Sequence, residues 1–263
     1  MSLKVSVLQS NQIHTFAIGD VHGRADLLNS MLSHIERMAS SGGFMYRVIF
    51  LGDIIDKGPE SRQAMDLVIG AVRSVPESQL ILGNHDAIPV TIIDEVDPEK
   101  ADMRLAFWMQ RQNGAATLLS YGFDPSTITV DRLRAELDPS HVAFLRDADH
   151  YVELDNHILV HAGLRPGILL KKQDSHDLMW IKEPFLTHPN DFEKIIIHGH
   201  TVTSSRLPEV YPNRVGIDTG ACQTGNLTAV RIVGSKITDF LWTKAENPHH
   251  VEHIEPEQRQ HRN

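Results

Sequence analysis

Residues 15–23 read TFAIGDVHG, a short apolar run that ends in a Gly-Asp pair with a histidine two residues further on. The run Thr15–Ile18 has the length and composition of a buried β-strand. Ala25–Met38 then carries apolar residues at helical spacing. A strand, a Gly-Asp pair and a helix in this order predict the first half of a β-α-β unit.

The same succession returns twice in the first third of the chain. Val48–Leu51 ends in Gly52-Asp53 and is followed by a helical pattern over Ser61–Val72. Gln79–Leu82 ends in Gly83-Asn84. This β-α-β-α-β order predicts a mostly parallel sheet with right-handed crossovers.

The rest of the chain predicts a helical segment and then a second set of strands. Residues 99–147 are helix-rich, and we expect an insertion that covers one edge of the site. Strands are expected at 151–154, 157–161, 194–198, 215–218, 227–233 and 236–242, with tight hairpin turns at 155–156, 224–226 and 234–235. We therefore expect an α/β (α+β) fold with two sheets packed face to face and helices outside. This domain would span 1–245, and the polar, His-rich tail 246–263 is expected to be poorly ordered.

Composition excludes several classes of function. The net charge of −9 is unfavourable for a general nucleic-acid binder, which needs basic residues against the phosphates. Cys222 is the single cysteine, so the chain cannot form an internal disulfide. The N-terminus has no apolar core of signal-peptide length, and no run reaches the roughly 20 apolar residues of a membrane span. We expect a cytoplasmic protein without a membrane partner.

Residues that can bind metal follow five of the expected strands. They are Asp20 and His22, Asp53 and Asp56, Asn84 to Asp86, His161, and His200. A Gly-Asp pair or a histidine after one strand is ordinarily a turn or a structural residue. Ligands in α/β sheets gather beyond the carboxyl ends of the strands, so five such ends predict one shared site. Mixed carboxylate, imidazole and amide donors suit Mn, Fe or Zn better than Ca.

The motif series Gly-Asp-x-His-Gly, Gly-Asp-x-x-Asp, Gly-Asn-His-Asp, His-x-Gly-Leu and Gly-His resembles the calcineurin-like metallophosphoesterases. The resemblance covers about Thr15 to Val230 and is greatest for the phosphoprotein phosphatase branch. Segments 160–167 and 216–221 look like the bacterial serine/threonine phosphatase-like members. The symmetrical diadenosine tetraphosphate hydrolases share most of these motifs. The resemblance implies a four-layer fold, in which helices flank a two-sheet β-sandwich.

The resemblance also implies a role for each matching residue. Two divalent cations, Mn²⁺ first and Fe or Zn as alternatives, would be held by Asp20, His22, Asp53, Asn84, His161 and His200. A hydroxide bound to the metals would attack phosphorus directly. His85 would protonate the leaving oxygen while Asp56 orients its ring. Phosphate would be bound by Arg165, Lys57 and Asn84.

Two positions depart from the family pattern. Lys57 stands where the family commonly has arginine, and lysine cannot make the two-pronged contact of a guanidinium with phosphate. An ordinary surface lysine is the alternative interpretation. Val202 stands where many metallophosphoesterases outside this branch have a further metal-binding histidine, and the absence of that histidine fits the phosphoprotein phosphatase branch.

Three functions remain open on the sequence. The first hypothesis is a phosphatase acting on phosphorylated Ser, Thr or Tyr in proteins. The second is a dinucleoside polyphosphate hydrolase of the diadenosine tetraphosphate type. The third is a non-catalytic metal-binding module, which the His85–Asp56 pair disfavours because such a module needs no general acid. A nucleotide enzyme should offer a deep pocket with aromatic and polar groups for adenine, whereas a protein phosphatase should offer an open groove. The similarity of segment 161–167 to bacterial protein phosphatase-like chains favours the first hypothesis.

Overall fold

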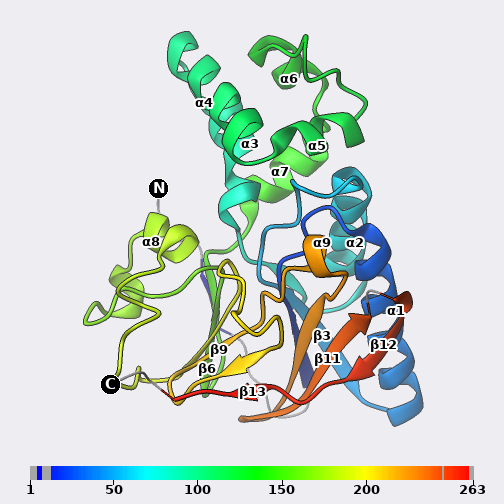
Figure 1. Ribbon diagram of the computed structural model, residues 1–263, viewed down its shortest axis with the longest axis vertical. Coiled ribbons are helices and arrows are strands. Elements are labelled where there is room, and N and C mark those ends of the chain that lie inside the picture. The colour runs from blue at the N-terminus through cyan, green and yellow to red at the C-terminus, as the bar shows by residue number, and fades with distance from the viewer. Residues whose placement is uncertain (1–4, 8–12, 245, 261–263) are drawn as a thin grey trace.

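The computed structural model describes residues 5–7, 13–244 and 246–260, which form two β-sheets within one layered fold (Figure 1). Within these residues, six strands form one sheet in the order β12 (Asn247–His253), β11 (Lys236–Lys244), β10 (Thr228–Val233), β2 (Ile13–Ile18), β3 (Met45–Phe50) and β4 (Gln79–Leu80). Seven form the other in the order β1 (Val5–Val7), β5 (Tyr151–Glu153), β6 (His157–Val160), β7 (Ile195–His198), β9 (Arg214–Gly216), β8 (Glu209–Val210) and β13 (Glu257–Gln258).

The predicted β-α-β-α-β unit is confirmed. Strands β2, β3 and β4 are parallel neighbours, connected by α1 (Ala25–Gly42) and α2 (Ser61–Ser74). The apolar stripe of α1, which includes Leu28, Met31 and Ile35, is fully buried against this sheet. The helices form because their apolar residues recur at the helical period and bury one face.

Alternation along β2 assigns each side chain to one of two cores. Phe16 and Ile18 face the helices, whereas Ala17 faces the second sheet. On the far side of the second sheet, Val160 and Ile196 pack with residues of α8 (Ser175–Trp180) and its flanking loops. The order helix, sheet, sheet, helix confirms the four-layer α/β fold.

Four helices occupy the segment expected to be a helical insertion. They are α4 (Pro98–Arg111), α5 (Gly114–Ser120), α6 (Val130–Glu136) and α7 (Pro139–Asp147), and they follow α3 (Asn84–Asp94). Together these helices stand beyond one end of the sandwich in Figure 1. Two shorter helices, the 3₁₀ turn η1 (Leu170–Lys172) and α9 (Ala221–Thr224), lie in loops of the last third. No helix among the described residues combines the length and apolarity needed to cross a membrane.

Two of the three expected hairpin turns are confirmed, and one prediction was wrong. Strands β5 and β6 pair antiparallel across 155–156, and β10 and β11 pair antiparallel across 234–235. Residues 224–226 instead end α9, with Gly225 in the left-handed conformation as its C-cap. The turn cannot make a hairpin because β9 and β10 belong to different sheets.

The expectation of a poorly ordered tail over 246–263 was also wrong for the described residues. Strand β12 pairs antiparallel with β11, and β13 pairs parallel with β8. Val251 is only 6% exposed and joins the core beneath α1, while Ile254 packs against the core between the sheets. One valine and one isoleucine suffice to hold this segment against the domain because the edge of β11 also pairs with its backbone. Residues 245 and 261–263 lie outside the described residues.

We expect Val251→Ala to lower the free energy of unfolding by about 1–3 kcal/mol, because it removes buried methyl groups and leaves a cavity. His250→Ala is the matched control, since His250 is exposed on the same strand and should change stability by less than about 0.5 kcal/mol. Denaturant unfolding measures both. If Val251→Ala changed the free energy of unfolding as little as His250→Ala does, the packing of β12 against the core would be contradicted.

Candidate active site

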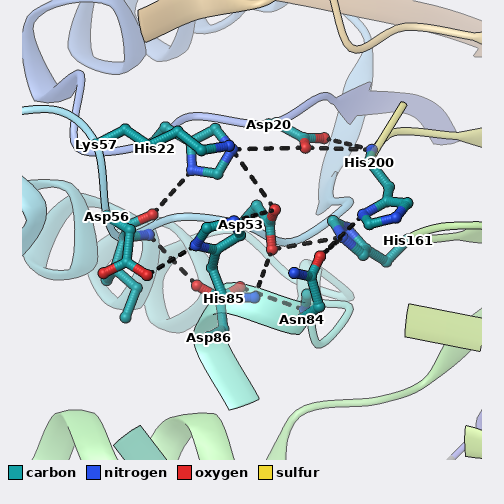
Figure 2. Close-up of polar contacts among 12 residues, drawn as sticks. Asp20, His22, Asp53, Asp56, Lys57, Asn84, His85, Asp86, His161 and His200 are labelled. Carbon is teal, nitrogen blue, oxygen red and sulfur yellow. Dashed lines mark hydrogen bonds and ion pairs between the residues drawn. The ribbon is translucent and has the colours of Figure 1, made fainter. Parts of the chain in front are cut away.

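Five chain segments from both sheets meet at one end of the sandwich (Figure 2). Strands β2 and β3 lead into the loops with Asp20 and Asp53, and β4 leads to Asn84 at the start of α3. Strands β6 and β7 of the other sheet lead into His161 and His200. Each of the predicted metal ligands is buried except His200, which is partly exposed. The structure therefore brings together residues that the sequence separates by up to 180 positions.

Asp53 lies at the centre of these side chains. Its Oδ2 is 3.5 Å from His22 Nε2, and its Oδ1 is 3.4 Å from His161 Nε2. Ligand atoms of His22, Asp53 and His85 lie within 4.8 Å of one another, and so do those of Asp53, His161 and His200. The carboxylate of Asp53 thus borders two adjacent groups of possible metal ligands.

The histidine tautomers leave lone pairs directed into the site. His22 Nδ1 donates to the Ile55 carbonyl at 2.9 Å, and His161 Nδ1 donates to the Leu51 carbonyl at 2.8 Å. Each Nε2 is then an acceptor in the neutral ring. His161 Nε2 lies 2.9 Å from Asn84 Oδ1, another acceptor. A cation bound between two such acceptors would remove their repulsion, and carbonyl partners of this kind orient metal-binding histidines in proteins.

Burial favours the neutral form of both the histidines and the carboxylates of the site. It lowers the pKa of both His22 and His200 to about 3, so the rings are neutral and ready to bind metal at pH 7. Burial, and next the charges of Asp218 and Asp53, raise the pKa of Asp20 well above its usual value. Buried carboxylates that repel one another are stabilised by a bound cation, so the residues fit divalent metal ions.

The backbone of the site adopts a conformation that non-glycine residues avoid. Positive φ angles of 46–72° occur at His22, Asp53, Asp56, Lys57 and His200. Such residues cluster at functional sites, where surrounding contacts hold the strain. Here the Asp53 carbonyl accepts from the backbone N–H groups of Val21 and His22, at 3.1 and 2.8 Å, and joins the first two loops.

The predicted catalytic pair is in contact. His85 Nδ1 lies 2.7 Å from Asp56 Oδ2, and its Nε2 faces the metal ligands, 3.9 Å from Asp53 Oδ2. Burial lowers the pKa of His85, but the charges of Asp53 and Asp56 more than offset it and leave that pKa above its usual value. The imidazole is therefore able to carry a proton at Nε2 beside the metal ligands.

The two predicted cationic phosphate ligands differ in position. Lys57 Nζ donates to His22 Nε2 at 2.6 Å, so this ammonium lies within the site rather than on an ordinary surface. Arg165 is half exposed, and its guanidinium forms a two-pronged ion pair with Asp177 at 2.5 and 2.6 Å. A contact between Arg165 and phosphate, which stays a prediction, would require that pair to open.

Two further buried acids, to which the sequence assigned no role, lie at the site. Asp218 is 2% exposed beside Asp20, and burial is the main cause that raises its pKa to about 6. Asp86 is fully buried, and its carboxylate accepts from the backbone N–H groups of Ile54 and Ile55 at 2.9 and 3.3 Å. Each stands in a motif already noted, 216–221 and 83–86. The signal in each case was an acidic residue within a motif at the end of an expected strand.

The family model described as calcineurin-like phosphoesterase matches residues 13–230, which is most of the chain. The chain belongs to the calcineurin-like phosphoesterase family. It is therefore a hydrolase, and the family depends on a binuclear metal centre.

The alignments with two curated relatives cover most of both chains. The symmetrical bis(5'-nucleosyl)-tetraphosphatase of Janthinobacterium is 28% identical and covers 90% of this chain and 97% of its own. The asymmetrical bis(5'-nucleosyl)-tetraphosphatase PrpE of Anoxybacillus flavithermus is 27% identical and covers 81% and 88%. Among solved structures, the cold-active protein-tyrosine phosphatase of a psychrophilic Shewanella has the same fold, with a TM-score of 0.59 at 13% identity over 97% and 83%.

We expect metal-free protein to bind two Mn²⁺ ions per chain in a calorimetric titration. Asp53→Asn should weaken both sites by more than the roughly 10–100-fold that loss of an outer-shell partner costs, because Asp53 borders both groups. Asp102→Asn, an exposed aspartate on α4, is the matched control and should bind as the unmodified chain does. Binding of only one Mn²⁺ per chain, or of two Mn²⁺ with affinities that Asp53→Asn leaves unchanged, would contradict the placement of Asp53 between two metal sites.

Proposed function

We propose that this phosphoesterase hydrolyses dinucleoside polyphosphates of the diadenosine tetraphosphate type with the help of two divalent cations. The reaction class rests on one arrangement, in which the His85–Asp56 pair faces the metal ligands around Asp53. The substrate class is supported by the curated relatives, both named as bis(5'-nucleosyl)-tetraphosphatases. In this proposal the substrate is a small phosphorylated molecule.

An aromatic pair beside the metal ligands favours a nucleotide substrate. Trp180 is half-buried, and its ring centroid lies 6.3 Å from that of His200 in an edge-on contact. His176 stacks on Trp180 at 6.0 Å with an interplanar angle of 15°. A ring so close to a metal ligand can stack with the base of a nucleotide whose phosphates lie at the metals.

The residues of this chain perform four tasks in the proposed reaction. Asp20, His22, Asp53, Asn84, His161 and His200 hold the cations, of which Mn²⁺ suits these donors and Fe or Zn are the alternatives. When bound, the cations supply Lewis acidity and activation of water at neutral pH. Lys57 and Arg165 contact the phosphate oxygens together with Asn84. His85 delivers its Nε2 proton to the leaving oxygen as the phosphorus–oxygen bond breaks, and Asp56 holds the Nδ1 proton.

A phosphoprotein phosphatase is the second candidate. It is favoured by segment 160–167, Val-His-Ala-Gly-Leu-Arg-Pro-Gly, which resembles bacterial serine/threonine phosphatase-like chains. The exposed Arg165 in this segment would suit a phosphorylated side chain on a protein surface. Since the attack on phosphorus is common to both candidates, only the groups that bind the rest of the substrate separate them. A binding module without activity is disfavoured by the buried His85–Asp56 pair.

A turnover panel on the Mn²⁺-loaded protein separates the candidates. We expect kcat/KM for diadenosine tetraphosphate to exceed that for phosphoserine, phosphothreonine and phosphotyrosine peptides by about tenfold or more, equivalent to about 1.4 kcal/mol of transition-state binding. Trp180→Ala should lower kcat/KM for the dinucleotide by roughly 5–150-fold through loss of stacking, and change nitrophenyl phosphate turnover little. A preference for phosphopeptides would favour the second candidate. Chromatography of the products identifies the bond that is cleaved.

Replacing His85 tests the acid step. A poor leaving group needs a proton, whereas nitrophenolate is already stable as an anion, so the loss should depend on the leaving group. We expect His85→Ala to lose about 10²–10⁴-fold on phenyl phosphate and markedly less on nitrophenyl phosphate. Metal content is measured in parallel. Equal losses on both substrates with metal retained would remove His85 from the chemistry.

A further inference from the structure

The carboxylate of Asp56 accepts hydrogen bonds from three separate helices. His85 on α3 contacts its Oδ2 at 2.7 Å. Trp108 on α4 donates its indole N–H to both carboxylate oxygens, at 2.9 and 3.0 Å. Thr117 on α5 donates its hydroxyl to Oδ1 at 2.6 Å. Two of the three donors thus come from the helical insertion, in which the sequence showed no catalytic pattern.

Thr117 contacts the backbone of Asp56 as well as its side chain. Asp56 has a φ of 72°, and such a conformation costs about 1–3 kcal/mol in a non-glycine residue. Its backbone N–H donates to Thr117 Oγ1 at 2.9 Å and to Ser61 Oγ at 3.1 Å. One hydroxyl therefore accepts from the N–H and donates to the carboxylate of the same residue. This closed pair of bonds stabilises the strained residue in a single orientation.

The position of Trp108 is determined by packing. Its side chain is fully buried in the core that α3 to α7 share with the first sheet. A Cβ on Gly114, the first residue of α5, would come within 2.6 Å of three indole atoms. The helix therefore lies directly against the ring because residue 114 has no side chain. This contact leaves the indole little freedom, and its N–H remains directed at Asp56.

We propose that Trp108 and Thr117 are positioning residues for the acid step, acting through Asp56 on His85. With Asp56 held, His85 keeps its Nδ1 proton in the 2.7 Å bond and presents Nε2 to the metal centre. The Nε2 proton then passes to the leaving oxygen, which keeps the electron pair of the broken phosphorus–oxygen bond. Without its donors, the carboxylate is free to rotate and His85 loses a defined direction. This inference rests on the acid role proposed above for His85.

The positioning role predicts a loss that depends on the leaving group. Thr117→Val keeps the shape of the side chain but removes the hydroxyl, and hydrogen bonds to a charged group contribute about 1.5–3 kcal/mol. In the Mn²⁺-loaded protein, we expect kcat for phenyl phosphate to fall by roughly 10–150-fold and that for nitrophenyl phosphate by less than about threefold. Thr117→Ser should restore phenyl phosphate turnover to within about threefold. Trp108→Phe removes the indole N–H together with part of the buried ring, so its stability must be measured alongside, and it should show the same selectivity.

Controls separate this inference from the acid role itself. Thr127→Val removes an exposed hydroxyl of the same insertion that does not touch Asp56, and should leave both rates unchanged. If His85→Ala is selective for phenyl phosphate but Thr117→Val lowers both substrates equally, the positioning role is overturned and the acid role stands. If His85→Ala is not selective, the acid role itself fails. Melting temperature and metal content are measured for every variant.

The indole N–H of Trp108 in the unmodified protein tests the contact without reference to activity. The indole N–H proton of Trp108, assigned by its absence in Trp108→Phe or by selective labelling, should be protected from exchange with solvent in NMR spectra. It should also shift on Asp56→Asn. A rapidly exchanging Trp108 signal would overturn the inference even if no variant folds.

Discussion

The crowding of acceptor atoms around Asp53 is the constraint on which the rest of this site depends. Its two oxygens face His22 and His161 at 3.5 and 3.4 Å, and both imidazoles have already donated their Nδ1 protons to backbone carbonyls. Acceptors held this close repel one another unless a cation lies between them. The loops that hold them are strained as well, since several have positive φ angles. The stability of the surrounding sandwich must therefore compensate for the site.

The two-sheet core supplies that compensation. Ala17 and Ile49 of one sheet pack against Leu159 and Ile197 of the other, directly behind the loops that carry the ligands. Because Asp20, Asp53 and Asn84 follow strands of one sheet and His161 and His200 follow strands of the other, the site exists only when both sheets are packed. Relative movement of the sheets would separate the two groups of ligands. The candidate metal centre and the inter-sheet core are in this sense one structural unit.

The helical insertion is coupled to the same unit through Asp56. Thr117 and Trp108 reach this carboxylate from helices that have no metal ligand of their own. The insertion therefore does more than cover one edge of the site. The opposite side of the site is bordered by α8, whose Trp180 packs edge-on against His200. Proposed acid chemistry and proposed base recognition thus lie on different sides of one metal centre.

The sequence alone determined the β-α-β-α-β unit and the strand ends with candidate metal ligands, because both depend on local periodicity and on residues that follow a strand. The edge strand β12 was not apparent, since its stability comes from pairing with β11 and from Val251 beneath α1. From the sequence, Trp108 was only part of a helix-rich segment, and Asp218 only the last residue of an expected strand. Only the tertiary structure decided their partners, because a hydrogen bond between residues 52 or 61 positions apart leaves no periodic trace in the chain.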